Sequence, residues 1–434
     1  MSFQRSIKAA ASAAVIVAAV SACSSGKSAS TTPTTATGIP SSTGSTSSSG
    51  SVKSYSGDVI KVGGFFSTAQ FAGSDIGAEA RFDRANKEDQ LGGARIEYVG
   101  TTNDPFDPAS SLSALRQMVG EQGIQAIVPD LSPFNNGQFL ASSKIPYVGY
   151  AFDDTYCTTS VSEPVWGFGY NGCLVPNNPP YLPDAYVSAY KFFSGKLGIA
   201  HPTLAVVSGD LQSGQLAAKF QASAAVGDGF KVVYAQGSLP QTVSDYTPYV
   251  QRWLTSAGGG QPNVIVCLEA AQCIPIFAAL QAGGFKGSFY DTLGDVPVLA
   301  KSLAGTFSST FYNPEPGAAY TQMADDINAF KPGTTLTPYS VIPAYLAADM
   351  FVSAVQQVEK QGKVLNATDL QIALDHQTWQ DGTLAGPLEY PQSAVSPTPS
   401  CAALVQYASD GSGAHVVEPY SCSYKTFPVD SKLG

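Results

Sequence analysis

The feature that most constrains the fold of this chain is a repeated alternation of short apolar segments with helical ones. Residues 59–62 form a short apolar run typical of a strand, and residues 76–87 carry apolar side chains at helical spacing. Asp107 and Pro108 then provide a helix start, with Asp as the N-cap and Pro in the first turn. Further strands are predicted at residues 96–99, 124–128 and 145–148. A strand–helix repeat at this spacing predicts parallel strands with helices on both faces of the sheet.

The alternation starts again after an interval rich in Pro and Gly at residues 164–183. The strands predicted in this second part are residues 203–207, 230–234, 264–268, 288–290 and 306–311. Long helical stretches at residues 318–330 and 343–361 no longer alternate with strands. Because the apolar faces of these helices must pack against a sheet, we expect the chain to return to the first sheet. With 434 residues the chain is too long for one core. The predicted fold class is α/β, with two doubly wound parallel-sheet lobes.

The N-terminal segment predicts export. Residues 1–22 combine a basic start with a short apolar run and small residues, which is typical of a signal peptide rather than a membrane-spanning helix. The motif Val20-Ser21-Ala22-Cys23 resembles the lipobox of bacterial lipoproteins, in which the cysteine is lipidated. An ordinary signal peptide with a chance cysteine is the alternative. Residues 23–57 are expected to be the lipidated Cys23 and a disordered tether, because Ser, Thr, Gly and Pro dominate there. We therefore expect a lipid-anchored protein on the extracytoplasmic face of the bacterial cell membrane.

The other six cysteines agree with an extracytoplasmic location, where disulfides persist. An even number permits complete pairing, and the simplest of the fifteen connectivities joins neighbours in the sequence. The predicted bridges are Cys157–Cys173, Cys267–Cys273 and Cys401–Cys422. A zinc site is the competing interpretation, but no pair has Cys-x-x-Cys spacing and the three histidines are scattered.

Composition and motifs argue against several classes of function. The net charge of −10 and the absence of a basic run disfavour a nucleic-acid partner. The predicted folded part contains no Gly-x-Ser-x-Gly, no His-Glu-x-x-His and no phosphate-binding glycine loop, so we predict neither an enzyme nor a cofactor or metal site. A carboxylate pair such as Asp153 with Glu269 leaves an extracellular hydrolase as a remote alternative.

Six segments carry a resemblance to a known family. They are residues 60–64, 77–86, 91–97, 104–119, 126–129 and 386–388. Their order and spacing resemble type I periplasmic binding proteins, of which the branched-chain amino-acid (Leu/Ile/Val) binding proteins of ABC importers are the best-known members. The likeness extends over residues 58–407. It implies two lobes joined by three crossovers, which close on a ligand by a hinge motion.

The resemblance also implies domain boundaries and partners. Residues 58–170 and 313–387 would form the first lobe, and residues 171–312 and 388–434 the second. The partners would be a small polar ligand, such as an amino acid or a related molecule, and the permease and ATPase subunits of an ABC importer. The membrane would be contacted through the lipid anchor, and we expect a monomer. A ligand-binding sensor that is not coupled to transport is the alternative, because the same fold serves both roles.

Ligands of open α/β sheets bind at the carboxyl ends of the strands, and clefts between domains are preferred pockets. The loop after the first strand contains Phe66, Ser67 and Phe71, and its aromatic rings either line the ligand or pack beneath the loop. Ser132 follows a later strand and is the nearest match to the serine that holds the ligand carboxylate in the family. Its alternative role is that of a plain N-cap.

A further loop of the first lobe is assigned from the resemblance. Residues 150–153, with Ala151, Phe152 and Asp153, match the segment that supplies backbone contacts and a threonine hydroxyl. Asp153 replaces that threonine and would repel a ligand carboxylate, unless it only caps a turn.

The second lobe offers three further candidates. Ser213 stands where many relatives have a stacking aromatic, and Glu269 stands where they have a tyrosine. Asp291 lies close to the position of the acid that binds an α-ammonium group. Together with Asp153, these acids make a cationic or polyhydroxylated ligand conceivable, although each alone is as readily a cap or an ion-pair partner.

Overall fold

The computed structural model describes residues 58–157, 164–176, 181–183, 187–269, 272–390, 401–422 and 426–429. The predicted signal peptide, Cys23 and the tether lie outside these described residues. All of the described residues belong to one compact unit. This unit contains two large sheets, and each sheet with its helices is called a lobe below.

The first lobe is built on a five-stranded sheet in the described part of the chain, with strand order β2-β1-β3-β4-β5. Every neighbouring pair is parallel. Its strands are β1 (Val59–Phe66), β2 (Arg95–Asn103), β3 (Ala126–Asp130), β4 (Tyr147–Gly149) and β5 (Gly167–Gly169). The α/β fold class expected from the strand–helix alternation is confirmed by this sheet.

The second lobe contains seven strands among the described residues, in the order β15-β14-β11-β10-β9-β7-β8. The five strands β7–β11 are parallel, whereas β14 and β15 run antiparallel at one edge. Its strands are β7 (Thr203–Gly209), β8 (Lys231–Leu239), β9 (Val264–Cys267), β10 (Ser288–Asp291), β11 (Phe307–Thr310), β14 (Cys401–Tyr407) and β15 (Ala414–Cys422). Two small ribbons complete the strands: β12 (Thr378–Asp381) with β13 (Ala385–Glu389), and β6 (Tyr181–Pro183) with β16 (Thr426–Pro428).

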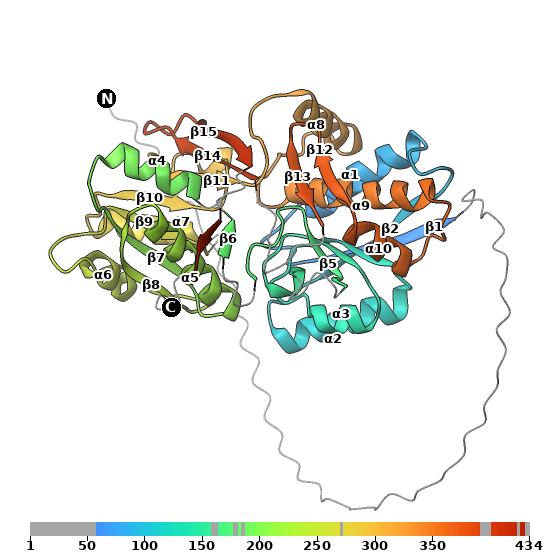
Figure 1. The fold of residues 1–434 in the computed structure, drawn as a ribbon, viewed down its shortest axis with the longest axis horizontal. Helices are drawn as coiled ribbons and strands as arrows, with labels where there is room; N and C mark the ends of the chain where they lie inside the picture. Colours follow the sequence, from blue (N-terminus) through green and yellow to red (C-terminus); the bar gives the residue numbers. More distant parts are fainter. Residues whose placement is uncertain are drawn as a thin grey trace, which may run out of the picture. The chain divides into compact units, whose positions relative to one another are not determined.

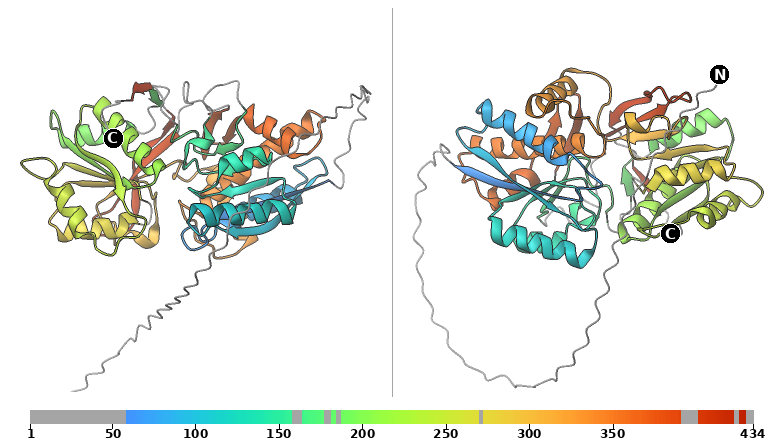
Figure 2. Two further views of the ribbon diagram at one scale, coloured as in Figure 1. Left: turned by 90° about the horizontal axis from the view of Figure 1, so that it is seen from below. Right: turned by 180° about the vertical axis from the view of Figure 1, so that it is seen from behind.

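The helices of the described residues cover these sheets. They are α1 (Ser74–Lys87), α2 (Pro108–Gln122), α3 (Gly137–Ser142), α4 (Val187–Leu197), α5 (Gln212–Gly227), α6 (Thr247–Thr255), α7 (Cys273–Ala282), α8 (Ala318–Phe330), α9 (Val341–Lys360) and α10 (Ala367–Asp375), with short 3-10 turns η1 (Asp154–Tyr156) and η4 (Pro297–Leu299). In the first lobe α1 and α9 lie on one side of the sheet and α2 and α3 on the other (Figures 1 and 2). Asp107 caps α2, and its side chain accepts a hydrogen bond from the Ser110 N–H at 2.9 Å.

Alternating residues on the strands of the second lobe divide its core between the two faces of the sheet. On β7, Leu204 and Val206 pack in a cluster with buried residues of α4 and α5. Their neighbours Ala205 and Val207 pack in another cluster with residues of α6 and α7. Because side chains point to opposite faces of a strand in turn, a strand buried on both sides is apolar throughout.

The chain returns to the first lobe after β11. Helix α9 packs against α1, α10 and β3, and α8 packs against α1. Gly77 in α1 permits the close approach of α9, since a Cβ there would lie 2.1 Å from the carbonyl oxygen of Val341. In the described part of the chain, α9 is the one helix long and apolar enough to cross a membrane, and its burial within the fold is that of a core helix.

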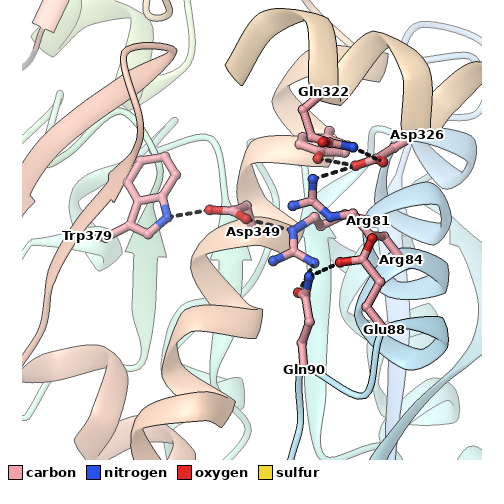
Figure 3. Close-up of polar contacts among 9 residues, drawn as sticks. Arg81, Arg84, Glu88, Gln90, Gln322, Asp326, Asp349 and Trp379 are labelled. Carbon is pink, nitrogen blue, oxygen red and sulfur yellow. Dashed lines mark hydrogen bonds and ion pairs between the residues drawn. The ribbon is translucent and has the colours of Figure 1, made fainter. Parts of the chain in front are cut away.

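Buried ion pairs connect α1 to α8 and to α9 (Figure 3). The Arg81 Nε donates to the Asp349 Oδ1 at 2.6 Å, and the other Asp349 oxygen accepts from the Trp379 indole N–H at 3.0 Å. Next to this pair, the Arg84 guanidinium lies 2.9 Å from Asp326 on α8. These contacts join segments more than two hundred residues apart in the sequence, so they fix the return of the chain to the first lobe.

The six cysteines of the described residues form the three local pairs that the sequence suggested, Cys157–Cys173, Cys267–Cys273 and Cys401–Cys422. Cys267 is the last residue of β9 and Cys273 the first of α7, so this bridge closes the turn between them. The described residues contain no group of three or more His, Cys, Asp or Glu that could hold a metal ion.

Candidate functional site

A cavity of about 570 Å³ is lined by residues from both lobes. In the first lobe its wall comes from the loops that follow β1, β2, β3, β4 and β5. In the second lobe it comes from the segments that follow β7, β8, β9, β10 and β11. The cavity therefore lies at the carboxyl ends of the strands of both sheets, where α/β proteins bind small molecules.

The wall from the first lobe is mostly aromatic and aliphatic. The ring centroid of Tyr150 lies 4.5 Å from that of Phe152 and 6.0 Å from that of Tyr170. Phe71 packs on Phe152 at 6.0 Å, and Phe311 from the second lobe reaches Tyr150 at 5.8 Å. Such a surface binds apolar or aromatic groups through burial and ring packing.

The wall from the second lobe is more polar. Glu269 follows β9, and its Oε1 accepts hydrogen bonds from the Gly209 N–H and from the Ser208 hydroxyl, the latter at 3.4 Å. Gln272 lies close by and is fixed in place, since its Oε1 accepts from the Tyr246 hydroxyl at 3.0 Å and its amide donates to the Gln241 carbonyl at 3.3 Å. This polar patch is carried by the turns after β7, β8 and β9.

Burial governs the ionisation of Glu269. Loss of solvent raises its pKa to about 7, while the hydrogen bonds from Gly209 and Ser208 favour the carboxylate and act in the opposite direction. Gly209 leaves room for the Glu269 carboxylate, since a Cβ there would lie 2.7 Å from the Glu269 Oε1. Glu269 therefore changes charge near neutral pH inside the cavity wall.

The loop after β1 places its predicted residues at different depths. Phe71 lies in the cavity wall. Phe66 is 1% exposed and packs behind the wall with Phe71 and Leu131, so its ring lies beneath the loop. Ser67 is buried outside the wall, and its carbonyl accepts from the Phe71 N–H at 2.8 Å, which closes the turn that presents Phe71.

Ser132 is fully buried and does not line the cavity. Its hydroxyl donates to the Asp104 carboxylate at 2.5 Å and accepts from the Phe134 N–H at 2.9 Å. Both interactions are internal to the first lobe. They hold the loop whose neighbouring residues Leu131 and Pro133 do reach the cavity, so the geometry gives Ser132 a supporting position and not a ligand contact.

In the loop after β4, Ala151 and Phe152 lie in the cavity wall, whereas Asp153 does not. The Asp153 carboxylate accepts hydrogen bonds from the Thr155 N–H at 2.9 Å and the Thr155 hydroxyl at 2.5 Å, and thereby caps η1. It borders a separate, smaller pocket of about 270 Å³ together with Asp154. Burial raises the pKa of Asp153 to about 6.

In the second lobe, Ser213 and Glu269 lie in the cavity wall, and Asp291 does not. Asp291 is fully buried at the end of β10, where its Oδ1 accepts from the Leu293 N–H at 2.9 Å and from the Ser308 hydroxyl. Burial raises its pKa to about 7. The next residue, Thr292, lines the cavity instead of Asp291. Of the three acids predicted to bind the ligand, Asp153, Glu269 and Asp291, Glu269 is therefore the one that lines the cavity.

Sequence reasoning missed several wall residues. The most important are Phe106, Tyr170, Phe220, Gln241, Gln272 and Tyr339. Phe106 follows β2, so its place after a strand end was a usable signal. Phe220 lies well inside α5 and Tyr339 in the connection to α9, and their places in the wall depend on packing that the sequence does not display.

The described fold and cavity define the class of the protein as a two-lobed binding protein. The model of the periplasmic binding protein family matches residues 58–412, and the chain belongs to this family, in its type I branch. No curated protein sequence matches the chain. The family and the fold are those of binding proteins rather than enzymes.

Solved structures of the same fold include several solute-binding proteins. A fatty acid ABC transporter substrate-binding protein from Thermomonospora curvata is 18% identical with a TM-score of 0.66, over 88% of this chain and 97% of that one. A solute-binding protein of an ABC transporter from R. palustris, in complex with 4-hydroxybenzoate, is 18% identical with a TM-score of 0.64, over 86% and 98%. A leucine-binding protein from Thermotoga maritima is 12% identical with a TM-score of 0.62, over 84% and 98%.

Proposed function

We propose that this protein is an extracytoplasmic solute-binding protein that captures a small molecule with a largely apolar body and delivers it to an ABC importer. The observation that carries the proposal is the cavity at the strand ends of both lobes, with its aromatic wall around Tyr150 and Phe152. Its volume is in the range of small-molecule sites, which hold a ligand mainly through apolar side chains and a few polar groups. The related structures with 4-hydroxybenzoate and for fatty acid support a ligand of this kind.

A branched-chain amino acid fits the cavity less well. Such a ligand carries both a carboxylate and an ammonium group, and Ser132 and Asp291 were expected to bind them. Both side chains are fully buried and hydrogen-bonded within their own lobes. The wall that remains favours an apolar body with one polar end.

The proposal excludes a catalytic role. The carboxylate pair considered for a hydrolase does not share the site, because Asp153 caps a turn outside the cavity wall while Glu269 lies within it. Four predictions from the sequence stay part of the proposal. They are the lipid anchor at Cys23, the tether at residues 23–57, the lobe boundaries at residues 170, 312 and 387, and the monomeric state.

The test begins with the ligand that accompanies the protein. Protein purified without denaturation from its own cells is analysed by native mass spectrometry, and the released solute is identified. Phe152→Ala should weaken binding by about 1–3 kcal/mol, because an aromatic ring that the ligand would cover is removed from the cavity wall. Phe139→Ala is the matched control, since Phe139 is a half-buried aromatic of the same lobe outside the cavity wall.

Transport is then measured with the identified solute. Cells that lack the protein should lose high-affinity uptake of this solute and regain it with the wild-type gene. Unchanged uptake together with intact binding would instead favour the ligand-binding sensor. Equal affinity of the Phe152→Ala and wild-type proteins would show that the solute does not bind in this cavity.

A further inference from the structure

The two walls of the cavity differ in chemistry. The first lobe contributes mostly apolar side chains, among them Phe71, Phe106, Leu131, Phe152 and the ring of Tyr150, with Gln70 as a polar exception. The second lobe contributes most of the polar side chains, and one group of them lies at the ends of β7, β8 and β9 and in the first turn of α5: Ser208, Ser213, Gln241, Thr242, Glu269 and Gln272. A molecule that fills this cavity therefore meets a mostly apolar side and a side on which polar and apolar groups are mixed.

Glu269 is the one charged side chain among the described residues of the wall. Within the described residues, its Oε1 takes both hydrogen bonds, from Gly209 and Ser208, and its Oε2 accepts none. The nearest charged neighbour, Asp210, is another acid that opposes its ionisation. A cation stabilises an ionised carboxylate at such a partly desolvated position, and no lysine, arginine or histidine of the described wall supplies one.

The backbone and the disulfide keep this carboxylate at the cavity. Gly209 leaves room for Glu269, and the bridge Cys267–Cys273 closes the turn that carries Leu268, Glu269 and Gln272 into the wall. Both cysteines are fully buried. The hydrogen bonds to Glu269 and the neighbouring bridge thus hold the carboxylate at the cavity wall.

We propose that the solute is an amphiphilic amine, whose aromatic or aliphatic body packs on the first lobe and whose ammonium group binds the free oxygen of Glu269. This inference rests on the proposed function of the same cavity and adds the charge of the ligand and its orientation. The amine supplies the missing cation, and Ser208, Gln241 and Gln272 surround the polar end. An anionic solute is the competing class, because the first turn of α5, with Ser213 and Gly214, also reaches the cavity and helix N-termini attract anions.

Three probes share a phenylalkyl chain and differ in their terminal group, and they distinguish a cationic from an anionic solute. 4-Phenylbutylamine ends in an ammonium group, 4-phenylbutan-1-ol in a hydroxyl group and 4-phenylbutyrate in a carboxylate. Their affinities for the full chain are measured by calorimetry at pH 8.5. The amine should bind most tightly, and Glu269→Gln should weaken it about 10-fold to 100-fold, as expected for the loss of a hydrogen bond between charged groups. Binding of the alcohol should hardly change. Asp410→Asn is the matched control, because it removes one acid from an exposed turn of the same lobe.

The pH dependence of the wild type gives a second readout that needs no variant. Glu269 titrates near pH 7, and the titratable groups facing it are Asp210 and Tyr246. The affinity for the amine should therefore fall as the pH is lowered from 8.5 to 5.5, because protonated Glu269 no longer attracts a cation. The alcohol should bind equally at both values.

The outcomes separate this inference from the proposed function. Tighter binding of 4-phenylbutyrate or of the alcohol than of the amine overturns the amine and leaves the apolar solute site standing. A preference for the amine that persists in Glu269→Gln, or that does not change with pH, overturns the role of Glu269. If none of the three probes binds, the inference and the apolar cavity site both fail.

Discussion

The replacement Asp349→Ala tests how the return of the chain to the first lobe is stabilised. Both oxygens of Asp349 are used, by the Arg81 Nε at 2.6 Å and by the Trp379 indole N–H at 3.0 Å. The side chains of Arg81 and Asp349 are 6% and 13% exposed. Removing the carboxylate leaves a guanidinium and an indole N–H buried without this partner. We expect a loss of about 3–5 kcal/mol in the free energy of unfolding, the range for a broken buried ion pair.

The assay is urea unfolding followed by circular dichroism, with two comparisons. Lys87→Ala removes the ion pair with Asp83 on the same helix, where the lysine side chain is 69% exposed, and should cost less than about 1 kcal/mol. The double variant Arg81→Met, Asp349→Leu removes both charges and should recover much of the loss. If Asp349→Ala costs no more than Lys87→Ala, the buried pair does not hold α9 on α1 in the way described here.

Three further predictions concern pH, the disulfide and the anchor. Burial raises the pKa of Glu269 and of Asp291 to about 7, so between about pH 4.5 and 7 the folded chain binds protons that the unfolded chain has released, and stability falls as the pH rises. Thermal melting should give a higher midpoint at pH 5.5 than at pH 8, and the opposite order would contradict the burial of these acids. The double variant Cys267→Ala, Cys273→Ala should stay folded but bind 4-phenylbutylamine several-fold more weakly in calorimetry, because the open turn no longer fixes Glu269; unchanged affinity would show that the bridge does not position the site. Cys23→Ala should be released into the medium and lose labelling by a fatty-acid analogue, whereas membrane retention equal to the wild type would remove the lipoprotein interpretation.

Most strands and helices up to β11 were readable from the sequence because apolar runs and helical periodicity are local signals, whereas strands β12–β16 were not predicted. The cap at Asp107 and the start of α2 at Pro108 agree with the prediction. Strand β5 (Gly167–Gly169) was missed, because its glycines have low strand propensity. Gly167 is required there by packing, since a Cβ would lie 2.4 Å from the ring of Tyr147.

The site was predictable only at the level of loops. Strand ends identified the segments that surround the cavity, and Phe71, Phe152, Ser213 and Glu269 lie in its wall. The direction of each side chain within a turn was not readable, because the local hydrogen bonds decide it. Ser132 is turned toward Asp104 and away from the cavity for this reason.

The most direct test of the central claim is hydrogen–deuterium exchange of the full chain with and without 4-phenylbutylamine. A ligand held between the lobes should slow exchange in both, at residues 130–132 and 150–153 of the first lobe and at residues 208–214 and 268–269 of the second. Glu269→Gln should reduce this protection at the same probe concentration. Protection confined to one lobe, or found only at segments outside the cavity wall, would contradict the account.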